Sequence, residues 1–186
     1  MTDPGLADDL GYHVIEPNPF QRAMQSFASS RLGAWLFSRV LRHLDNAVGR
    51  LSHGRTSAPR LLAGIPVLDV TTTGRKSGLP RTSHLIAVPY AGTLALLGTN
   101  FGQPSTPAWV LNLEADPRAT AVHAGRSREV VARPATEPEQ AGVLAASTQV
   151  YGGYLKYQQR ITTRRLRIFL LAPVSADPAQ VNAQER

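Results

Sequence analysis

Hydrophobic residues follow two different spacings along this chain, a helical one in its first third and an extended one afterwards. Between residues 20 and 51, apolar side chains recur mostly at steps of three to five, which predicts a long amphipathic helix. Asn18 and Pro19 suit the N-cap and the first turn, so we expect the helix to begin there. Residues 1–17 are expected to form a loose leader, and residues 1–59 together an N-terminal appendage.

After this appendage, short apolar runs bounded by glycine and proline predict strands. We expect six strands, over residues 67–72, 81–90, 93–100, 119–124, 127–133 and 166–171. Helices are expected over residues 108–115 and from about residue 137 to residue 161, the second interrupted near Gly152. Mostly antiparallel strands with inserted helices indicate a mainly β domain, a small barrel over residues 60–173. Residues 174–186 read as a tail.

The turn between the first two expected strands gathers three cations. Two glycines bracket Arg75, Lys76 and Ser77, and Arg81 begins the returning strand. Guanidinium and ammonium groups form charge-assisted hydrogen bonds, and a glycine-containing turn adds backbone N–H donors. The cluster therefore suits an anion with several oxygens, with an ordinary solvated hairpin loop as the alternative. A Walker phosphate-binding loop is excluded, because its Gly-x-x-x-x-Gly-Lys-Ser/Thr spacing is absent.

Composition points to acidic partners and excludes some kinds of catalytic and metal site. The 186 residues include 20 basic and 13 acidic ones, a formal net charge of +7, and 18 of the basic residues are arginines. This balance favours phosphates, polycarboxylates, nucleic acid or an anionic membrane surface as partners. The absence of cysteine excludes disulfides and cysteine nucleophiles, and the five histidines lack metal-ligand spacing. No metal site is therefore expected.

The sequence gives no sign of secretion or of a membrane span. Residues 1–9 lack the features of a signal peptide, and the longest nearly apolar run, Leu32–Phe37, is too short to cross a bilayer. We therefore expect a cytoplasmic protein of undecided oligomeric state. The basic helix over residues 20–51 leaves peripheral membrane contact open, although packing on the domain or on a second subunit is the commoner role. No aromatic-interleaved basic strand appears, which argues against nucleic-acid binding.

Three tyrosines, Tyr151, Tyr154 and Tyr157, are spaced by three and would lie along one side of a helix. Core packing normally uses phenylalanine or leucine, because every buried hydroxyl must find a partner, so the tyrosines favour the wall of an aromatic pocket. The chain has no paired-carboxylate arrangement, no convincing Ser-His-Asp set and no dinucleotide fingerprint. Any redox or group-transfer chemistry would have to come from a cofactor.

Several motifs together resemble the deazaflavin-dependent nitroreductase family. They are Thr71–Arg81, Asn100–Gly102 and Pro107–Pro117, in this order, followed by the tyrosine series. The resemblance covers about residues 65 to 172. It implies a split β-barrel of the kind that binds flavin mononucleotide, here with the deazaflavin coenzyme F420 as cofactor.

The family pattern assigns roles to residues of this chain. It implies cofactor contacts by Arg75, Lys76, Ser77, Arg81, Ser83, Thr99, Asn100, Gly102, Ala108, Trp109 and Asn112. The basic loop would meet the cofactor's phosphate and acidic tail, the residues from position 99 to position 102 would bracket the tail or ring, and the helix residues would line the ring. The three tyrosines would shape the space where the oxidant stacks. Ser83-His84, Ile86 and Asn100 depart from the residues of the best-known members.

The resemblance implies hydride transfer from reduced coenzyme F420 to a quinone or an activated nitroaromatic compound. The anion that develops on the oxidant would be stabilised by a hydroxyl, with Tyr154 and Tyr157 as candidates, or protonated from water. One alternative is reduction of a carbon–carbon double bond in a lipid or other metabolite. Another is a non-catalytic barrel that carries this cofactor, flavin mononucleotide or haem, since fold alone does not determine function.

Overall fold

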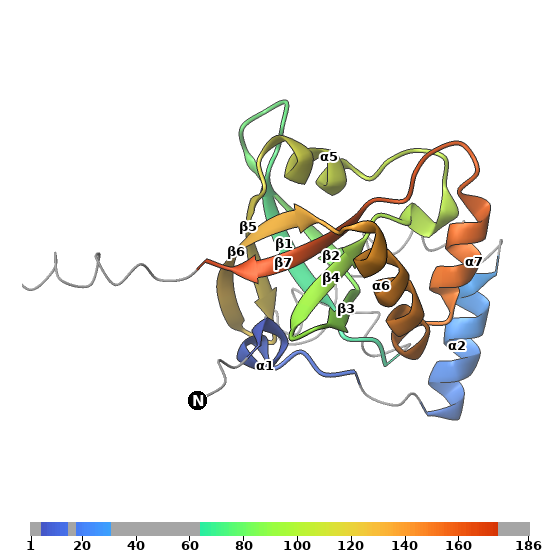
Figure 1. Ribbon diagram of the computed structural model, residues 1–186. Coiled ribbons are helices and arrows are strands. Elements are labelled where there is room, and N and C mark those ends of the chain that lie inside the picture. The colour runs from blue at the N-terminus through green and yellow to red at the C-terminus, as the bar shows by residue number, and fades with distance from the viewer. Residues whose placement is uncertain (1–4, 15–17, 31–63, 175–186) are drawn as a thin grey trace, which may run out of the picture.

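Seven antiparallel strands form the centre of the fold in this computed structural model, which describes residues 5–14, 18–30 and 64–174 (Figure 1). The strands are β1 (Leu68–Thr73), β2 (Pro80–Leu85), β3 (Ala87–Tyr90), β4 (Thr93–Leu97), β5 (Arg118–His123), β6 (Arg126–Pro134) and β7 (Ile168–Pro173). Their order in the sheet is β2-β1-β5-β6-β7-β4-β3, and every pairing is antiparallel. The mainly antiparallel topology predicted from the hairpin signals is confirmed.

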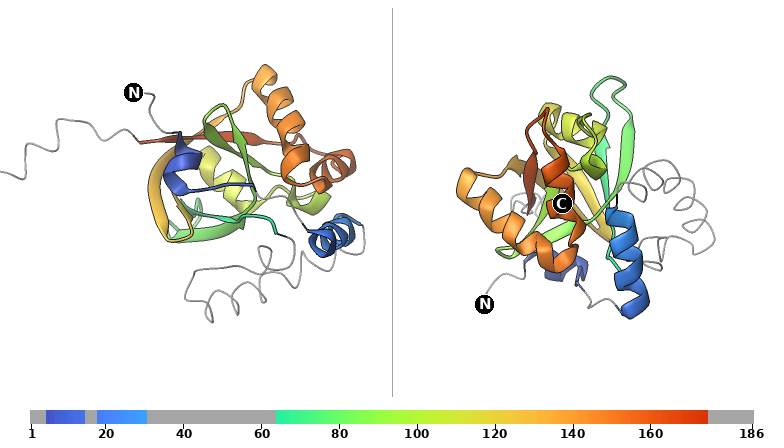
Figure 2. Two further views of the ribbon diagram at one scale, coloured as in Figure 1. Left: turned by 90° about the horizontal axis from the view of Figure 1, so that it is seen from below. Right: turned by 90° about the vertical axis from the view of Figure 1, so that its right-hand side faces the viewer.

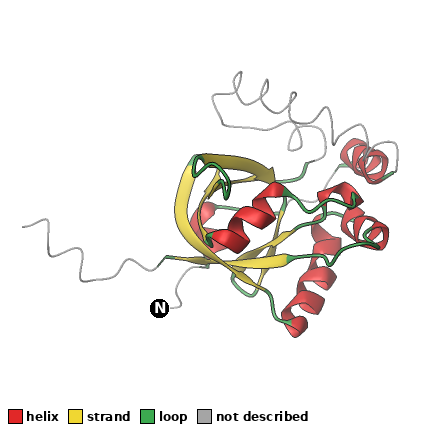
Figure 3. Cartoon of the chain, turned by 90° about the horizontal axis from the view of Figure 1, so that it is seen from above, coloured by secondary structure: helices red, strands yellow, loops and turns green. Residues whose placement is uncertain are grey.

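The sheet closes into a barrel at Ile86. β2 and β3 lie at opposite ends of the strand order, yet only Ile86 separates them along the chain. The two edges of the sheet therefore meet at this residue, and Figures 1 and 3 show the strands curling around a common interior. The single strand predicted over residues 81–90 is wrong in this respect, because its two halves pair with different partners, β1 and β4. The six expected strands become seven by this division.

The hydrophobic core has two parts. The first fills the barrel, where alternate residues of β1, Leu68 and Val70, are fully buried. The second lies between the barrel and the helices α6 (Glu137–Val150) and α7 (Gly153–Arg160), which Figure 2 shows together on one side of the sheet. The break predicted near Gly152 is confirmed, since it separates these two helices.

The expectation of a loose leader over residues 1–17 is wrong for its described part. Helix α1 (Leu6–Leu10) buries Leu6 and Leu10 in the barrel core, and Tyr12 follows them there. The Tyr12 hydroxyl accepts a 2.9 Å hydrogen bond from the backbone N–H of Ala87. A helix of five residues is too short to produce a periodic signal, so its apolar residues were not recognisable as a core contribution. This segment belongs to the barrel and not to a separate appendage.

Helix α2 (Pro19–Ser29) begins as predicted. The Asn18 side chain accepts a hydrogen bond from the Gln21 N–H and the Gln21 side chain accepts one from the Asn18 N–H, a complete capping box. The helix ends at Ser29, because Ser30 has extended backbone (φ −69°, ψ 165°). The predicted continuation to residue 51 falls in residues 31–63, which lie outside the described residues. α2 packs beside α7 (Figure 2).

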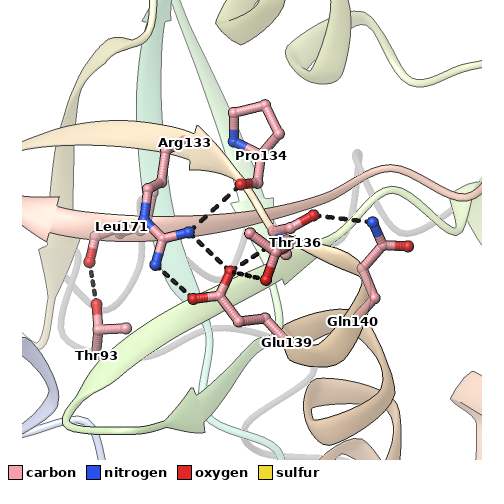
Figure 4. Close-up of polar contacts among 8 residues, drawn as sticks. Thr93, Arg133, Pro134, Thr136, Glu139, Gln140 and Leu171 are labelled. Carbon is pink, nitrogen blue, oxygen red and sulfur yellow. Dashed lines mark hydrogen bonds and ion pairs between the residues drawn. The ribbon is translucent and has the colours of Figure 1, made fainter.

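An ion pair fixes the start of α6 (Figure 4). Arg133, near the end of β6, donates two hydrogen bonds of 2.6 and 2.8 Å to the Glu139 carboxylate. Glu139 also accepts from the N–H and the hydroxyl of Thr136, which caps the helix. These donors lower the pKa of Glu139 to about 2, with the Arg133 guanidinium as the largest cause. The cap predicted from the Thr-Glu-Pro-Glu sequence is confirmed.

Candidate functional site

The basic loop, defined here as residues 74–79 between β1 and β2, is a tight turn with its side chains in solvent. The Gly74 carbonyl accepts a 2.7 Å hydrogen bond from the Gly78 N–H, and Gly78 has a positive φ of 66° that suits glycine. Arg75, Lys76 and Ser77 are exposed on it, and Arg81 is exposed at the start of β2. The hairpin that the sequence predicted is present, and it displays three cations at one end of the barrel.

Asn112 fixes the base of this loop from helix α5 (Ala108–Ala115). Its side-chain oxygen accepts a 3.1 Å hydrogen bond from the Arg75 N–H, and its amide nitrogen donates a 3.0 Å bond to the Thr72 hydroxyl. Asn112 and Thr72 are both buried. The buried amide thus joins α5 to the point where the chain leaves β1. Asn112 positions the backbone of the basic loop.

The other predicted ring-lining residues of α5 differ in exposure. Ala108 is exposed at the first position of the helix. Trp109 is 7% exposed, and its indole packs edge-on to Phe169 with ring centroids 6.2 Å apart. Ser83 stands opposite Val70 in the β1–β2 pair and is half-buried. Ala108 is therefore the most exposed of these three residues.

The 98–103 loop follows β4 and contains an unusual run of backbone conformations. Asn100, Phe101 and Gly102 all have positive φ, at 46°, 55° and 77°. Glycine and asparagine tolerate this region, but it is unfavourable for a bulky aromatic residue such as Phe101. The strand predicted to reach residue 100 ends at Leu97, because the chain turns here.

Arg164, in the connection between α7 and β7, binds the backbone of the 98–103 loop. Its guanidinium donates hydrogen bonds to three carbonyl oxygens of the loop, those of Gly98 (2.9 Å), Thr99 (2.9 Å) and Gln103 (3.2 Å). Burial lowers the pKa of Arg164, and the neighbouring Arg167 lowers it further. The side-chain amide of Asn100 also donates to the backbone and hydroxyl oxygens of Ser105, both at 3.0 Å.

The backbone amides of Asn100 and Phe101 donate no hydrogen bond within the described part of the chain. Thr99 has right-handed helical backbone (φ −72°, ψ −32°), and left-handed residues follow it. Successive N–H groups in such a right-to-left sequence form a concave anion-binding nest. The loop therefore offers two backbone donors for an anionic group.

The three tyrosines are buried and their hydroxyls are hydrogen-bonded. Tyr151 caps the end of α6, whereas Tyr154 and Tyr157 lie on α7, so the prediction that all three line one side of a helix is wrong for Tyr151. The Tyr151 and Tyr157 hydroxyl oxygens are 3.0 Å apart, and the Tyr154 hydroxyl donates a 2.7 Å hydrogen bond to the Ile86 carbonyl. Burial raises the pKa of each tyrosine, so all three are neutral at ordinary pH.

Tyr157 connects this tyrosine cluster to the 98–103 loop. Its ring lies edge-on to that of Phe101, with centroids 5.9 Å apart, and the Arg160 guanidinium lies 5.7 Å from its centroid. Gly102 approaches the same helix so closely that a Cβ there would lie 2.9 Å from the Cβ of Arg160. Figure 1 shows the two halves of the candidate site, α5 beside the basic loop and the 98–103 loop against α7.

Sequence reasoning missed Arg164, Phe101 and Tyr12. Arg164 belongs to a basic run near the last strand and carries no local motif, and its partners lie more than 60 residues earlier. The positive φ of Phe101 has no signature in an aromatic residue, although the Gly102 that follows it hints at a turn.

Within the described residues, no group of three potential metal ligands occurs and no helix has the length and apolarity to cross a bilayer.

Comparison with known proteins finds a family and relatives that carry the same description. Residues 42–173 match the F420H(2)-dependent quinone reductase family. The chain is 29% identical over 147 residues to an F420H(2)-dependent quinone reductase of Mycobacterium tuberculosis (strain H37Rv), an alignment that covers 75% of this chain and 97% of the relative. A protein of Mycobacterium bovis matches to the same extent.

Solved structures agree on the fold. An F420-H2 dependent reductase, FDR-A, superposes with a TM-score of 0.53 at 28% identity, covering 57% of this chain and 94% of that one. A second chain, described as a domain-swapped dimer, has a TM-score of 0.55 at 24% identity and covers 68% of this chain and 95% of that one. The barrel described above is a split β-barrel of this kind.

Proposed function

This chain belongs to the F420H(2)-dependent quinone reductase family, and from this premise we propose how its residues hold coenzyme F420 and its oxidant. The protein is an oxidoreductase that uses reduced coenzyme F420 and passes a hydride to a quinone. The observation that supports the proposal is the β1–β2 hairpin, which exposes Arg75 and Lys76 on the basic loop and Arg81 at the start of β2, with a buried asparagine bracing the loop.

The hydrogen-bond donors of the basic loop and of the 98–103 loop suit the cofactor's chemistry. Coenzyme F420 is a polyanion with a phosphodiester and a tail of glutamates. Arg75, Lys76 and Arg81 supply charge-assisted hydrogen bonds from exposed positions. The Asn100 and Phe101 amides add neutral donors in a nest, which favours a single anionic group. We assign the basic loop and the nest to different parts of the cofactor's charged chain.

The bound cofactor supplies the hydride, from the C5 carbon of its reduced ring. The protein's contribution is to hold ring and oxidant face to face and to exclude water. Ala108 has no side chain beyond Cβ, so a flat ring can approach the start of α5 closely. Trp109, the next residue, packs edge-on against Phe169 and makes the start of α5 rigid.

Tyr157 is the tyrosine we assign to the oxidant. It contacts Phe101 of the 98–103 loop, so it lies next to the nest that we assign to the cofactor. Its phenol stays neutral and can donate to the oxygen of a quinone as negative charge develops there. Tyr154, which the sequence favoured equally, donates to the Ile86 carbonyl and acts as a positioning residue. Tyr151 orients Tyr157 through the bond between their hydroxyls.

A binding titration tests the cofactor assignment. Purified protein is titrated with coenzyme F420, flavin mononucleotide and haem under the same conditions. The proposal expects saturable binding of coenzyme F420 that weakens with added salt, because ion pairs at exposed sites are screened. Preferential binding of flavin mononucleotide or haem would favour a barrel that carries another ligand. A panel of quinones, nitroaromatics and activated alkenes then separates quinone reduction from the other acceptor classes.

We also propose peripheral contact with an anionic membrane, the source of lipid-soluble quinones. Phe20 and Phe27 are 62% and 41% exposed on α2, and their spacing of seven puts them on one face of the helix. Replacing both by serine should reduce co-sedimentation with anionic vesicles. Val131→Ser, at an exposed apolar position on β6, is the control. Equal sedimentation of the original protein, the double serine variant and Val131→Ser would contradict the proposal.

A further inference from the structure

We propose that Arg164 is a positioning residue of the cofactor site: its guanidinium holds the 98–103 loop in the conformation that presents the Asn100 and Phe101 amides to an anionic group of the cofactor. This role rests on the proposed function and extends it to a residue outside the family motifs quoted above. It follows from the three carbonyl contacts of Arg164 and from the backbone of the loop.

Arg164 keeps the 98–103 loop in its unusual conformation. A left-handed aromatic residue persists only where surrounding contacts impose it. Here one guanidinium binds the carbonyls of Gly98 and Thr99 before the left-handed run and that of Gln103 after it. The planar fork of arginine reaches three acceptors at once, which the single ammonium of lysine does not match. Arg164 thus fixes both ends of the turn.

Arg164 also determines the direction in which the Asn100 N–H points. In a trans peptide unit the C=O and the following N–H point opposite ways. Because the Thr99 carbonyl points at Arg164, the Asn100 N–H of the same peptide unit points away from it. The arginine therefore sets the orientation of the first donor of the nest, and the Phe101 N–H follows in the same turn. Loss of the contact would free this peptide to rotate.

Arg164 also adds positive charge near the 98–103 loop. Within the residues that the structure describes, no carboxylate forms an ion pair with Arg164, whose partners are carbonyl oxygens. Its positive charge is therefore only partly offset and adds to the potential that an approaching anion meets. Gly102 lets the loop sit directly on α7, so that the nest stays close to this side of the barrel.

The test compares Arg164→Lys and Arg164→Gln with Arg165→Lys, a change at the exposed neighbouring arginine. For each protein, the Kd for coenzyme F420, the melting temperature and kcat at saturating reduced cofactor are measured. We expect Arg164→Lys to weaken cofactor binding at least 10-fold although the charge is kept, with kcat at saturation within about 2-fold of the original protein. Arg165→Lys should bind normally.

The outcomes separate this inference from the proposed function. If the unmodified protein does not bind coenzyme F420, the proposed function fails, and this role with it. If the unmodified protein binds and Arg164→Lys binds equally well, only the positioning role is overturned. Amide hydrogen exchange of the unmodified protein keeps the test decisive should the variants fail to fold. The Asn100 and Phe101 amides should become protected when the cofactor binds, and unchanged exchange would overturn the proposal.

Discussion

The hydroxyl of Tyr154 donates a 2.7 Å hydrogen bond to the carbonyl oxygen of Ile86, the one residue between β2 and β3. The next residue, Ala87, donates its N–H to the hydroxyl of Tyr12 at 2.9 Å. Two tyrosines separated by most of the chain therefore form hydrogen bonds to the backbone where the chain passes from one edge of the sheet to the other. Barrel closure depends on polar contacts as well as on apolar packing.

Tyr154→Phe should destabilise the fold and have a smaller effect on the chemistry. The substitution leaves the partly buried Ile86 carbonyl without this donor, and because an unsatisfied group in the interior costs about 1–3 kcal/mol, we expect a loss in the lower part of that range. Denaturant unfolding measures the loss. Tyr90→Phe is the control, since the Tyr90 hydroxyl makes no hydrogen bond within the described residues. Equal stability of the two variants would contradict the role given to Tyr154.

Leu10→Ala tests whether the N-terminal segment is part of the core. Leu10 is fully buried among barrel residues, so the truncation should cost about 2–5 kcal/mol in the free energy of unfolding. Asp8→Ala, at an exposed position of the same short helix, should cost far less. If both changes had the same small effect, α1 would not contribute to the barrel core.

Glu139→Gln should lower stability in a pH-dependent way. The folded-state pKa of Glu139 is about 2, below its ordinary value of 4.5, so its stabilising contribution is full above about pH 4.5 and is lost as pH falls towards 2. The difference in melting temperature between the original protein and the variant should therefore shrink over this interval. Glu137→Gln in the same helical turn serves as the control. If the difference in melting temperature stayed constant from pH 7 to pH 2, the ion pair between Arg133 and Glu139 would not be its cause.

Lys76→Glu should weaken cofactor binding and leave turnover of the saturated enzyme largely intact. Reversing one charge in the basic loop removes a charge-assisted contact, which amounts to about 1.5–3 kcal/mol, or roughly 10-fold or more in Kd. Lys156→Glu makes the same change of net charge at an exposed position of α7. A large loss of kcat in Lys76→Glu with unchanged affinity would give the loop a catalytic role instead of an anchoring one.

Local signals in the sequence predicted the parts of the fold that local contacts determine. The cap at Asn18, the cap at Thr136 and the basic hairpin each depend on residues a few positions apart. The bend at Ile86 and the buried place of Leu10 depend on partners far along the chain, so periodicity alone does not reveal them. Distance along the chain, more than residue type, limited the prediction.

The same distinction between contacts near and far along the chain applies to the candidate site. The side chains of Arg75 and Lys76 were recognisable because a short glycine-bracketed turn exposes them. The bond from the Arg75 N–H to Asn112 spans 37 positions, and the bonds from Arg164 to the 98–103 loop span more than 60. Sequence motifs thus predict which residues face the cofactor, whereas the residues that hold them in place become visible only in the folded chain.

The most direct test of the central claim follows the oxidation of reduced coenzyme F420 by menadione, recorded by absorbance. We predict enzyme-dependent oxidation that saturates in both reactants, together with a lower kcat in Tyr157→Phe at an unchanged Kd for the cofactor. Failure of the purified protein to bind or oxidise reduced coenzyme F420 in the presence of a quinone would contradict the account.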